Sequence, residues 1–163
     1  FNHYTAVQAS KELAPFKPML MEEPVVPDNN DSLAWVRDHA AVPIAAGERF
    51  YGKYAWQDVL RKNCVDIGQP DIFHNGGILE SKKVAAMCEA VHVPVSFHNP
   101  SGPISNAAIL QLASTVPNFI SAETPIAAAA ITANISFFIF PPPSSSSRHR
   151  TSSSAPTGGS QHW

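Results

Sequence analysis

The sequence predicts an α/β protein in which about five βα units form part of a parallel (β/α) barrel. Three observations favour this fold class. Short apolar runs recur at a steady interval, amphipathic helical patterns lie between them, and each run ends at a residue that can act as a ligand, an acid or a base. Parallel strands need long crossovers, so this alternation is typical of a parallel sheet covered by helices.

Five apolar runs are the predicted strands, and a polar residue directly follows each of them. The runs cover residues 18–21, 42–47, 65–70, 93–97 and 118–122, and the residues that follow them are Glu22, Glu48, Asp71, His98 and Glu123. These five polar residues stand 23 to 27 positions apart. A repeat of this length indicates a series of similar supersecondary units.

Four segments between the runs carry apolar residues at helical spacing. The stripes are Leu33, Val36 and Ala40; Trp56, Val59 and Leu60; Val84, Met87, Cys88 and Val91; and Ile109, Leu112, Ala113 and Val116. Spacings of three and four residues place such side chains on one face of a helix. We interpret each face as the side that packs on the sheet. The tryptophan and methionine residues in them are therefore predicted core residues rather than a cofactor site.

Two architectures share this alternation, an open doubly wound sheet and a closed barrel. A barrel brings the carboxyl ends of several strands to one site, whereas an open sheet forms its site at a single switch point. Because every predicted strand ends in a ligand or acid–base residue, the pattern favours the barrel. A whole barrel has eight strands in about 250 residues. Five strands in a chain of 163 residues therefore form only part of one.

A partial barrel has consequences for the partners of the chain. It leaves a free strand edge on each side, and such edges pair readily with other chains. Two partners fit this expectation: a second copy of the chain, which gives a homo-oligomer, or a full-length paralogue.

The composition limits the other classes of partner. The 13 acidic and 11 basic residues give a net charge of −2, and 15% of the residues are charged, against about 25% in an average domain. This balance provides no basic surface for nucleic acid and no polybasic patch for a membrane. Two cysteines, Cys64 and Cys88, are too few for a disulfide framework. We expect them to be small buried thiols in a reducing, cytoplasmic environment.

The composition changes after residue 123. Every acidic residue lies at or before Glu123, and the residues after it hold two arginines as their only fixed charges. We therefore assign residues 1–123 to the partial barrel domain and residues 124–140 to an apolar extension of undefined structure. Residues 141–163 contain eight serines, four prolines and two glycines. This composition buries too little surface to offset the entropy of folding, so we expect a disordered C-terminal tail.

The residues at the strand ends suggest a metal-assisted acid–base site. Glu22 and Glu48 end adjacent strands, and hard cations such as Mg²⁺ prefer carboxylate oxygens. Asp71 and His98 end the next two strands, and a carboxylate beside an imidazole fixes its tautomer and raises its basicity. Such a set suits proton abstraction next to a carboxylate, with the metal stabilising the enediolate. Glu123 could hydrogen-bond the developing anion.

Each of these residues has a simpler interpretation when taken alone. Glu22 could be a solvated strand end, and His98 could be a structural histidine. Asp71 could cap the helix that follows it. Their joint recurrence at the interval of the βα unit favours a shared site over these separate explanations.

Four segments around the strand ends carry longer motifs. They are Met21-Glu22-Glu23-Pro24, Ala46-Gly47-Glu48-Arg49, Gln69-Pro70-Asp71 and His98-Asn99-Pro100-Ser101-Gly102-Pro103-Ile104. Together they resemble the enolase superfamily and, within it, the mandelate racemase subgroup. The resemblance is closest to sugar-acid dehydratases of the galactonate dehydratase type and covers about residues 5–123. It implies a TIM-type barrel that is incomplete in this chain.

The resemblance also implies a role for each residue at a strand end. Glu22 and Glu48 match two metal-ligand carboxylates, and the implied metal is Mg²⁺. His98 matches an acid–base histidine and Asp71 its partner, while Glu123 matches a carboxyl group that contacts the substrate. The implied reaction is dehydration of a sugar acid, an aldonate such as galactonate, to a 2-keto-3-deoxy acid. It proceeds through removal of the α-proton and a metal-stabilised enediolate.

Some parts of the family pattern have no match in this chain. The first metal ligand, a second acid–base residue beside it and the capping domain would all lie before Phe1. We therefore expect this chain alone to be inactive and the activity to belong to the complete enzyme. Two other interpretations stay open: a racemase or epimerase of the same superfamily, and a non-catalytic truncated remnant that acts only through a partner.

Overall fold

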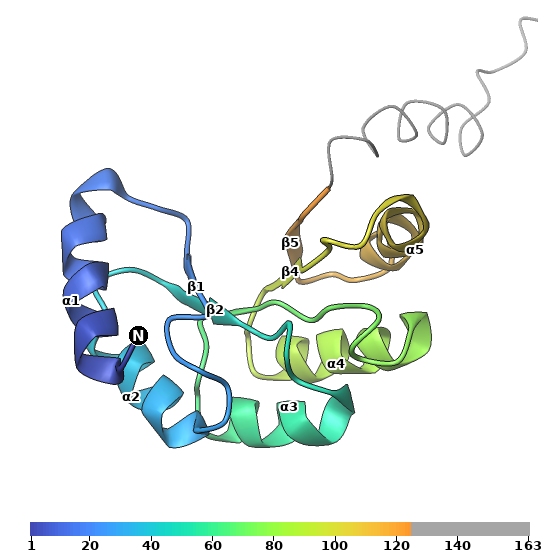
Figure 1. Ribbon diagram of the computed structural model, residues 1–163. Coiled ribbons are helices and arrows are strands. Elements are labelled where there is room, and N and C mark those ends of the chain that lie inside the picture. The colour runs from blue at the N-terminus through green and yellow to red at the C-terminus, as the bar shows by residue number, and fades with distance from the viewer. Residues whose placement is uncertain (125–163) are drawn as a thin grey trace, which may run out of the picture.

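The computed structural model describes residues 1–124 of the chain and shows a parallel sheet with helices (Figure 1). The strands are β1 (Met21–Glu22), β2 (Ile44–Ala46), β3 (Ile67–Gly68), β4 (Val95–Phe97) and β5 (Phe119–Ala122). The helices are α1 (His3–Leu13), α2 (Asn30–His39), α3 (Gly52–Arg61), α4 (Ile78–Ala90) and α5 (Pro103–Ala113), with a short 3₁₀ helix, η1 (Ala14–Phe16), after α1. All five predicted strands and all four predicted helices are confirmed.

The order of the strands in the sheet decides between the two candidate architectures. The strands lie side by side in chain order, β1-β2-β3-β4-β5, and every neighbouring pair is parallel. A doubly wound sheet would reverse its order at a switch point, whereas a barrel adds each strand on the same side of the last. Figure 1 shows the helices around the outside of a curved sheet. The prediction of a partial barrel is confirmed.

The helix α1 was not predicted, because its buried face consists of small side chains. Only Ala6, Val7 and Ser10 are buried in it. The hydroxyl of Ser10 donates to the Val7 carbonyl at 2.7 Å and accepts from the Ala41 backbone N–H at 3.0 Å. This polar contact joins α1 to the segment between α2 and β2. A face of small and polar residues has too weak an apolar pattern to indicate a helix.

Two glycines make room for the indole of Trp56, which lies in the core between α3 and the sheet. Trp56 is fully buried. A Cβ atom on Gly68 would lie 3.1 Å from Trp56 Cζ3 and 3.3 Å from Cys88 Sγ. A Cβ atom on Gly47 would lie 2.6 Å from Trp56 Cζ2. These glycines let a large aromatic side chain approach the strand ends closely, so they fix the distance between α3 and the sheet.

Both cysteines lie in the core, as predicted. Cys64 and Cys88 are fully buried and free. Burial raises the pKa of the Cys64 thiol to about 11 and that of the Cys88 thiol to about 12. Both thiols therefore stay protonated near neutral pH and pack as small apolar groups.

In the part of the chain that the structure describes, the last strand of the sheet is β5, whose four residues are only partly buried or exposed. We predicted an apolar extension over residues 124–140 and a tail over residues 141–163. Apart from residue 124, both segments lie outside the described residues. Within residues 1–124, no helix has both the length and the apolar character needed to cross a membrane.

The first prediction concerns the contact between Gly68 and Trp56. We expect Gly68→Ala to lower the free energy of unfolding by about 1–3 kcal/mol, because the added methyl group presses on the indole. The loss of stability caused by Gly68→Ala should be smaller in a Trp56→Phe background, because phenylalanine lacks the indole atoms that the added methyl group would contact. Urea unfolding of the four proteins measures this coupling. An equal cost in both backgrounds would contradict the packing described here.

The second prediction concerns Glu80 at the start of α4, which joins this helix to α3. Its carboxylate lies 2.7 Å from Lys53 Nζ and 3.1 Å from Lys83 Nζ, and these bonds lower the pKa of Glu80 to about 2. A lowered folded-state pKa gives stability that is present above the unfolded-state value and is lost as the pH falls through the folded one. We expect Glu80→Gln to lower stability at pH 7.

The difference between the native chain and Glu80→Gln should shrink below about pH 4.5 and vanish near pH 2. Urea midpoints measured along this pH range provide the comparison. Glu89→Gln is the matched control, because Glu89 lies on the same helix and forms no ion pair with the other described residues. A constant difference down to pH 2 would exclude the ion pairs as its cause.

Candidate active site

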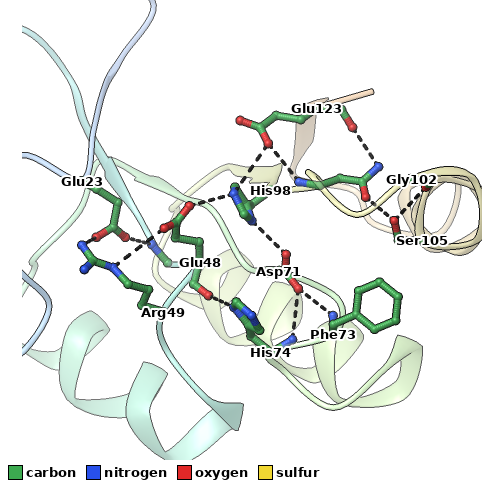
Figure 2. A network of polar contacts seen from close by, with 12 residues as sticks. Glu23, Glu48, Arg49, Asp71, Phe73, His74, His98, Gly102, Ser105 and Glu123 are labelled. Atoms are coloured by element: carbon green, nitrogen blue, oxygen red, sulfur yellow. Dashed lines mark hydrogen bonds and ion pairs between the residues drawn. The ribbon is translucent and has the colours of Figure 1, made fainter. Parts of the chain in front are cut away.

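The five predicted site residues lie at the carboxyl edge of the sheet, each at or just after the end of its strand. Because the strands are parallel and adjacent, their ends meet at one edge of the sheet. A single bridge between Asp71 and His98 continues the pairing of β3 and β4 beyond the strands. Figure 2 shows how four of these side chains, those of Glu48, Asp71, His98 and Glu123, turn toward one another.

His98 is the centre of this group of contacts. Its Nδ1 atom lies 2.8 Å from Asp71 Oδ2, and its Nε2 atom lies 2.7 Å from Glu48 Oε2. Ionised carboxylates only accept hydrogen bonds, so a protonated ring with two N–H groups satisfies both contacts. Only 12% of the His98 side chain is exposed. The two contacts therefore lie largely out of water, where a charged hydrogen bond is stronger.

Asp71 contacts His98 and also caps a turn, but it does not cap the following helix, because the N-cap residue of α4 is Gly77. Its Oδ1 atom accepts from the backbone N–H groups of Phe73 at 2.7 Å and His74 at 3.0 Å, which caps the turn after β3. Its Oδ2 atom contacts His98. The side chain is almost fully buried. The cap therefore holds the carboxylate in the orientation that the imidazole needs.

The carboxylates around His98 give this edge of the sheet excess negative charge. Burial raises the pKa of Glu22 above its ordinary value, and the charge of Glu123 raises it further. His98 opposes this effect, while Glu48 and Glu23 add to it. A carboxylate that its neighbours destabilise in this way gains from a bound cation. The oxygen-rich donor set therefore fits a hard metal ion.

Three of the residues offer ligand atoms that converge. Atoms of Glu22, His98 and Glu123 all lie within 4.8 Å of one another. Glu48 does not belong to this group, because its carboxylate faces His98 Nε2. The two predicted metal ligands, Glu22 and Glu48, thus lie at the same edge of the sheet, but only Glu22 belongs to the converging group, while Glu48 contacts His98.

Glu123 reaches the site from the edge strand β5. Its Oε2 atom accepts from the backbone N–H of Asn99 at 3.0 Å and lies 3.8 Å from His98 Nε2. The side chain is 43% exposed. The carboxylate therefore stands beside the imidazole with one side open to a ligand.

Two residues beside Glu48 were not singled out from the sequence. The Glu23 carboxylate accepts from the Gly47 backbone N–H at 3.0 Å and from the Arg49 guanidinium at 2.7 Å. Glu23 has a φ of +42°, a left-handed conformation that is rare for a residue with a side chain. This strained turn directs Glu23 to the end of β2 rather than to His98. The Glu23–Arg49 pair is recognisable only once β1 and β2 are known to be neighbours.

His74 is a third such residue, in the loop between β3 and α4. Its Nδ1 atom is hydrogen-bonded to the backbone carbonyl of Glu48, and its ring lies 5.4 Å from that of Tyr51. The backbone N–H of His74 also donates to Asp71 Oδ1. His74 therefore ties the loop that carries Asp71 to the strand end that carries Glu48. In the sequence, the only indication that His74 lies near the site was its position three residues after Asp71.

Several known proteins resemble the chain. The family model "Enolase C-terminal domain-like" matches residues 1–146. The D-galactonate dehydratase of Ralstonia pickettii is 44% identical over 102 residues, and the D-xylonate dehydratase of Haloferax volcanii is 34% identical over 123 residues. These matches cover 63% and 76% of this chain, but only 27% and 30% of the two relatives.

Solved structures agree with this result. A mandelate racemase/muconate lactonizing enzyme-like protein from Roseovarius superposes with a TM-score of 0.75 at 36% identity, over 82% of this chain and 34% of its own. An enolase from Agrobacterium radiobacter, with sodium and L-malate bound, gives a TM-score of 0.75 at 32% identity, over 77% of this chain and 32% of its own.

The chain spans about a third or less of the length of these relatives. Within that span, the resemblance predicted from the four motifs is confirmed. The family model extends over most of the chain, and the chain therefore belongs to the enolase C-terminal domain-like family.

Proposed function

We propose that this edge of the sheet is one part of an active site that dehydrates a sugar acid, an aldonate such as galactonate, to a 2-keto-3-deoxy acid. The observation that carries the proposal is His98, held between Asp71 and Glu48 beside further carboxylates. The names of the two curated dehydratases support the class of substrate. The L-malate bound to the Agrobacterium enolase is also a hydroxy acid. The complete enzyme, rather than this chain alone, is the proposed catalyst.

Glu22 and Glu48 are the proposed ligands of Mg²⁺. Their oxygen atoms suit this ion, and the unfavourable charge on Glu22 favours a cation at this place. When bound, the ion would supply positive charge to the substrate carboxylate and so lower the pKa of the neighbouring C–H group.

His98 is the proposed acid for the loss of the hydroxyl group. Asp71 fixes the orientation of the imidazole through Nδ1, so Nε2 faces the other strand ends and can hold a proton for the leaving group. In the complete enzyme, a base outside the described residues would take the α-proton. The electron pair of that C–H bond forms the new double bond as the β C–O bond breaks. The departing hydroxyl takes the Nε2 proton and leaves as water. The resulting enol then becomes the keto acid.

Glu123 is the proposed substrate contact. Its carboxylate lies 3.8 Å from His98 Nε2 and has an open side. It can accept a hydrogen bond from a substrate hydroxyl next to the histidine that protonates the leaving group.

The third prediction tests the function in a chimeric enzyme. Residues 21–123 of this chain replace the matching segment of the Ralstonia pickettii D-galactonate dehydratase. We expect Mg²⁺-dependent formation of a 2-keto-3-deoxy acid from D-galactonate. His98→Asn should lower kcat by about 10²-fold or more, because it removes the acid.

The matched control is His92→Asn, since His92 is exposed in the loop before β4 and has a φ of +61°, which Asn tolerates well. A fully active His98→Asn chimera would overturn the role of His98. An epimerised acid in place of the keto acid would favour a racemase or epimerase.

The fourth prediction concerns metal binding by the 163-residue chain, with Mn²⁺ as a paramagnetic substitute for Mg²⁺. Water-proton relaxation measures its affinity. We expect Glu22→Gln and Glu48→Gln each to weaken binding by about tenfold or more. His98→Asn should keep or strengthen it, because Glu48 is then free to turn toward the ion. Loss of binding in His98→Asn would instead make His98 the ligand, together with Glu22 and Glu123.

A further inference from the structure

A group of buried polar side chains lies behind Glu123, between the end of β4 and the start of α5. Asn99, Ser105 and Asn106 are each 2% exposed or less. Buried polar groups cost stability unless they are hydrogen-bonded. The proposed reaction gives none of these three residues a role, so the group needs its own explanation.

The side chain of Asn99 uses both its donor and its acceptor. Its Nδ2 atom donates to the backbone carbonyl of Glu123 at 3.1 Å and lies 3.4 Å from Asn106 Oδ1. Its Oδ1 atom accepts from the hydroxyl of Ser105, which also lies 2.9 Å from the Gly102 carbonyl. A carbonyl can only accept, so the Glu123 carbonyl requires the NH₂ group of Asn99 to face it. The orientation of the amide is thereby determined.

Asn99 therefore holds Glu123 at two points. The side-chain amide fixes the backbone of Glu123, and the backbone N–H of Asn99 donates to the Glu123 carboxylate at 3.0 Å. Glu123 directly follows β5, the edge strand of the described sheet, whose residues are only partly buried or exposed. An edge strand has partners on one side only, so its end depends more on such side-chain contacts.

We propose that Asn99 is a positioning residue, which acts through Glu123 by holding its carboxylate beside Nε2 of His98. Its importance for catalysis rests on the proposed function, where Glu123 contacts the substrate. The positioning itself needs no substrate and can be tested without one. A result that refutes the positioning role of Asn99 can therefore be distinguished from a result that refutes the proposed reaction.

The test uses NMR spectra of the 163-residue chain and follows the backbone amide of residue 99. In the native chain, this amide proton should lie downfield, and Glu123→Gln should shift it upfield, because the charged acceptor is lost. In Asn99→Ala, the amide remains but the carboxylate is released. The proton should then lie upfield, exchange with solvent about tenfold faster, and no longer respond to Glu123→Gln.

Asn118→Ala is the matched control. Asn118 also donates to two backbone carbonyls, those of Val93 at 2.8 Å and Ala85 at 3.2 Å, but it lies just before β5, at the other end of the strand. It should lower stability without moving the signal of residue 99. An equal shift in this control would mean general loosening and would overturn the proposal.

Ser105→Ala is a second variant, which carries the test if Asn99→Ala does not fold. It removes the donor to Asn99 Oδ1 and should shift the amide of residue 99 in the same direction by a smaller amount. An amide that keeps its position and its response to Glu123→Gln in these variants would show that the backbone alone holds Glu123, and the proposal would fail.

Discussion

The arrangement of the site depends on one interaction, the contact of His98 with a carboxylate on each side. Asp71 on one flank and Glu48 on the other lie within 2.8 Å of the two ring nitrogens. The three residues come from three successive strands, so the histidine joins the ends of β2, β3 and β4. Supporting contacts keep its partners in place: backbone N–H groups of the turn after β3 donate to Asp71, and His74 is hydrogen-bonded to the backbone carbonyl of Glu48.

The fold makes this contact available because its strands follow one another without a reversal. Five parallel strands in chain order deliver one polar side chain each to the same edge. Trp56 and the glycines beside it determine how closely α3 approaches these ends. Burial, together with the charges of neighbouring carboxylates, raises the pKa of Glu22, so its negative charge is unfavourable at this edge of the sheet. In the proposed function, a bound cation would offset this cost.

The sequence predicted the strands, four of the helices and the clustering of strand-end residues, because regular spacing determines all three. It did not reveal α1, whose buried face is small and partly polar, or the pairing of Glu48 with His98, which depends on side-chain orientation. The contacts of Glu23 with Gly47 and of Asn99 with Glu123 join residues about one βα unit apart. Hydrogen bonds to backbone groups follow no residue pattern, so only the folded arrangement shows them.

The central claim is that Glu22 and Glu48 bind the metal ion while His98 stays with Asp71 for acid–base chemistry. A crystal structure of the chain grown with Mg²⁺ tests it most directly. We expect that the Glu48 carboxylate turns from His98 to the ion, that Glu22 binds the same ion, and that the contact between His98 and Asp71 is retained. An ion bound to His98 Nε2, with Glu48 left unligated, would contradict it.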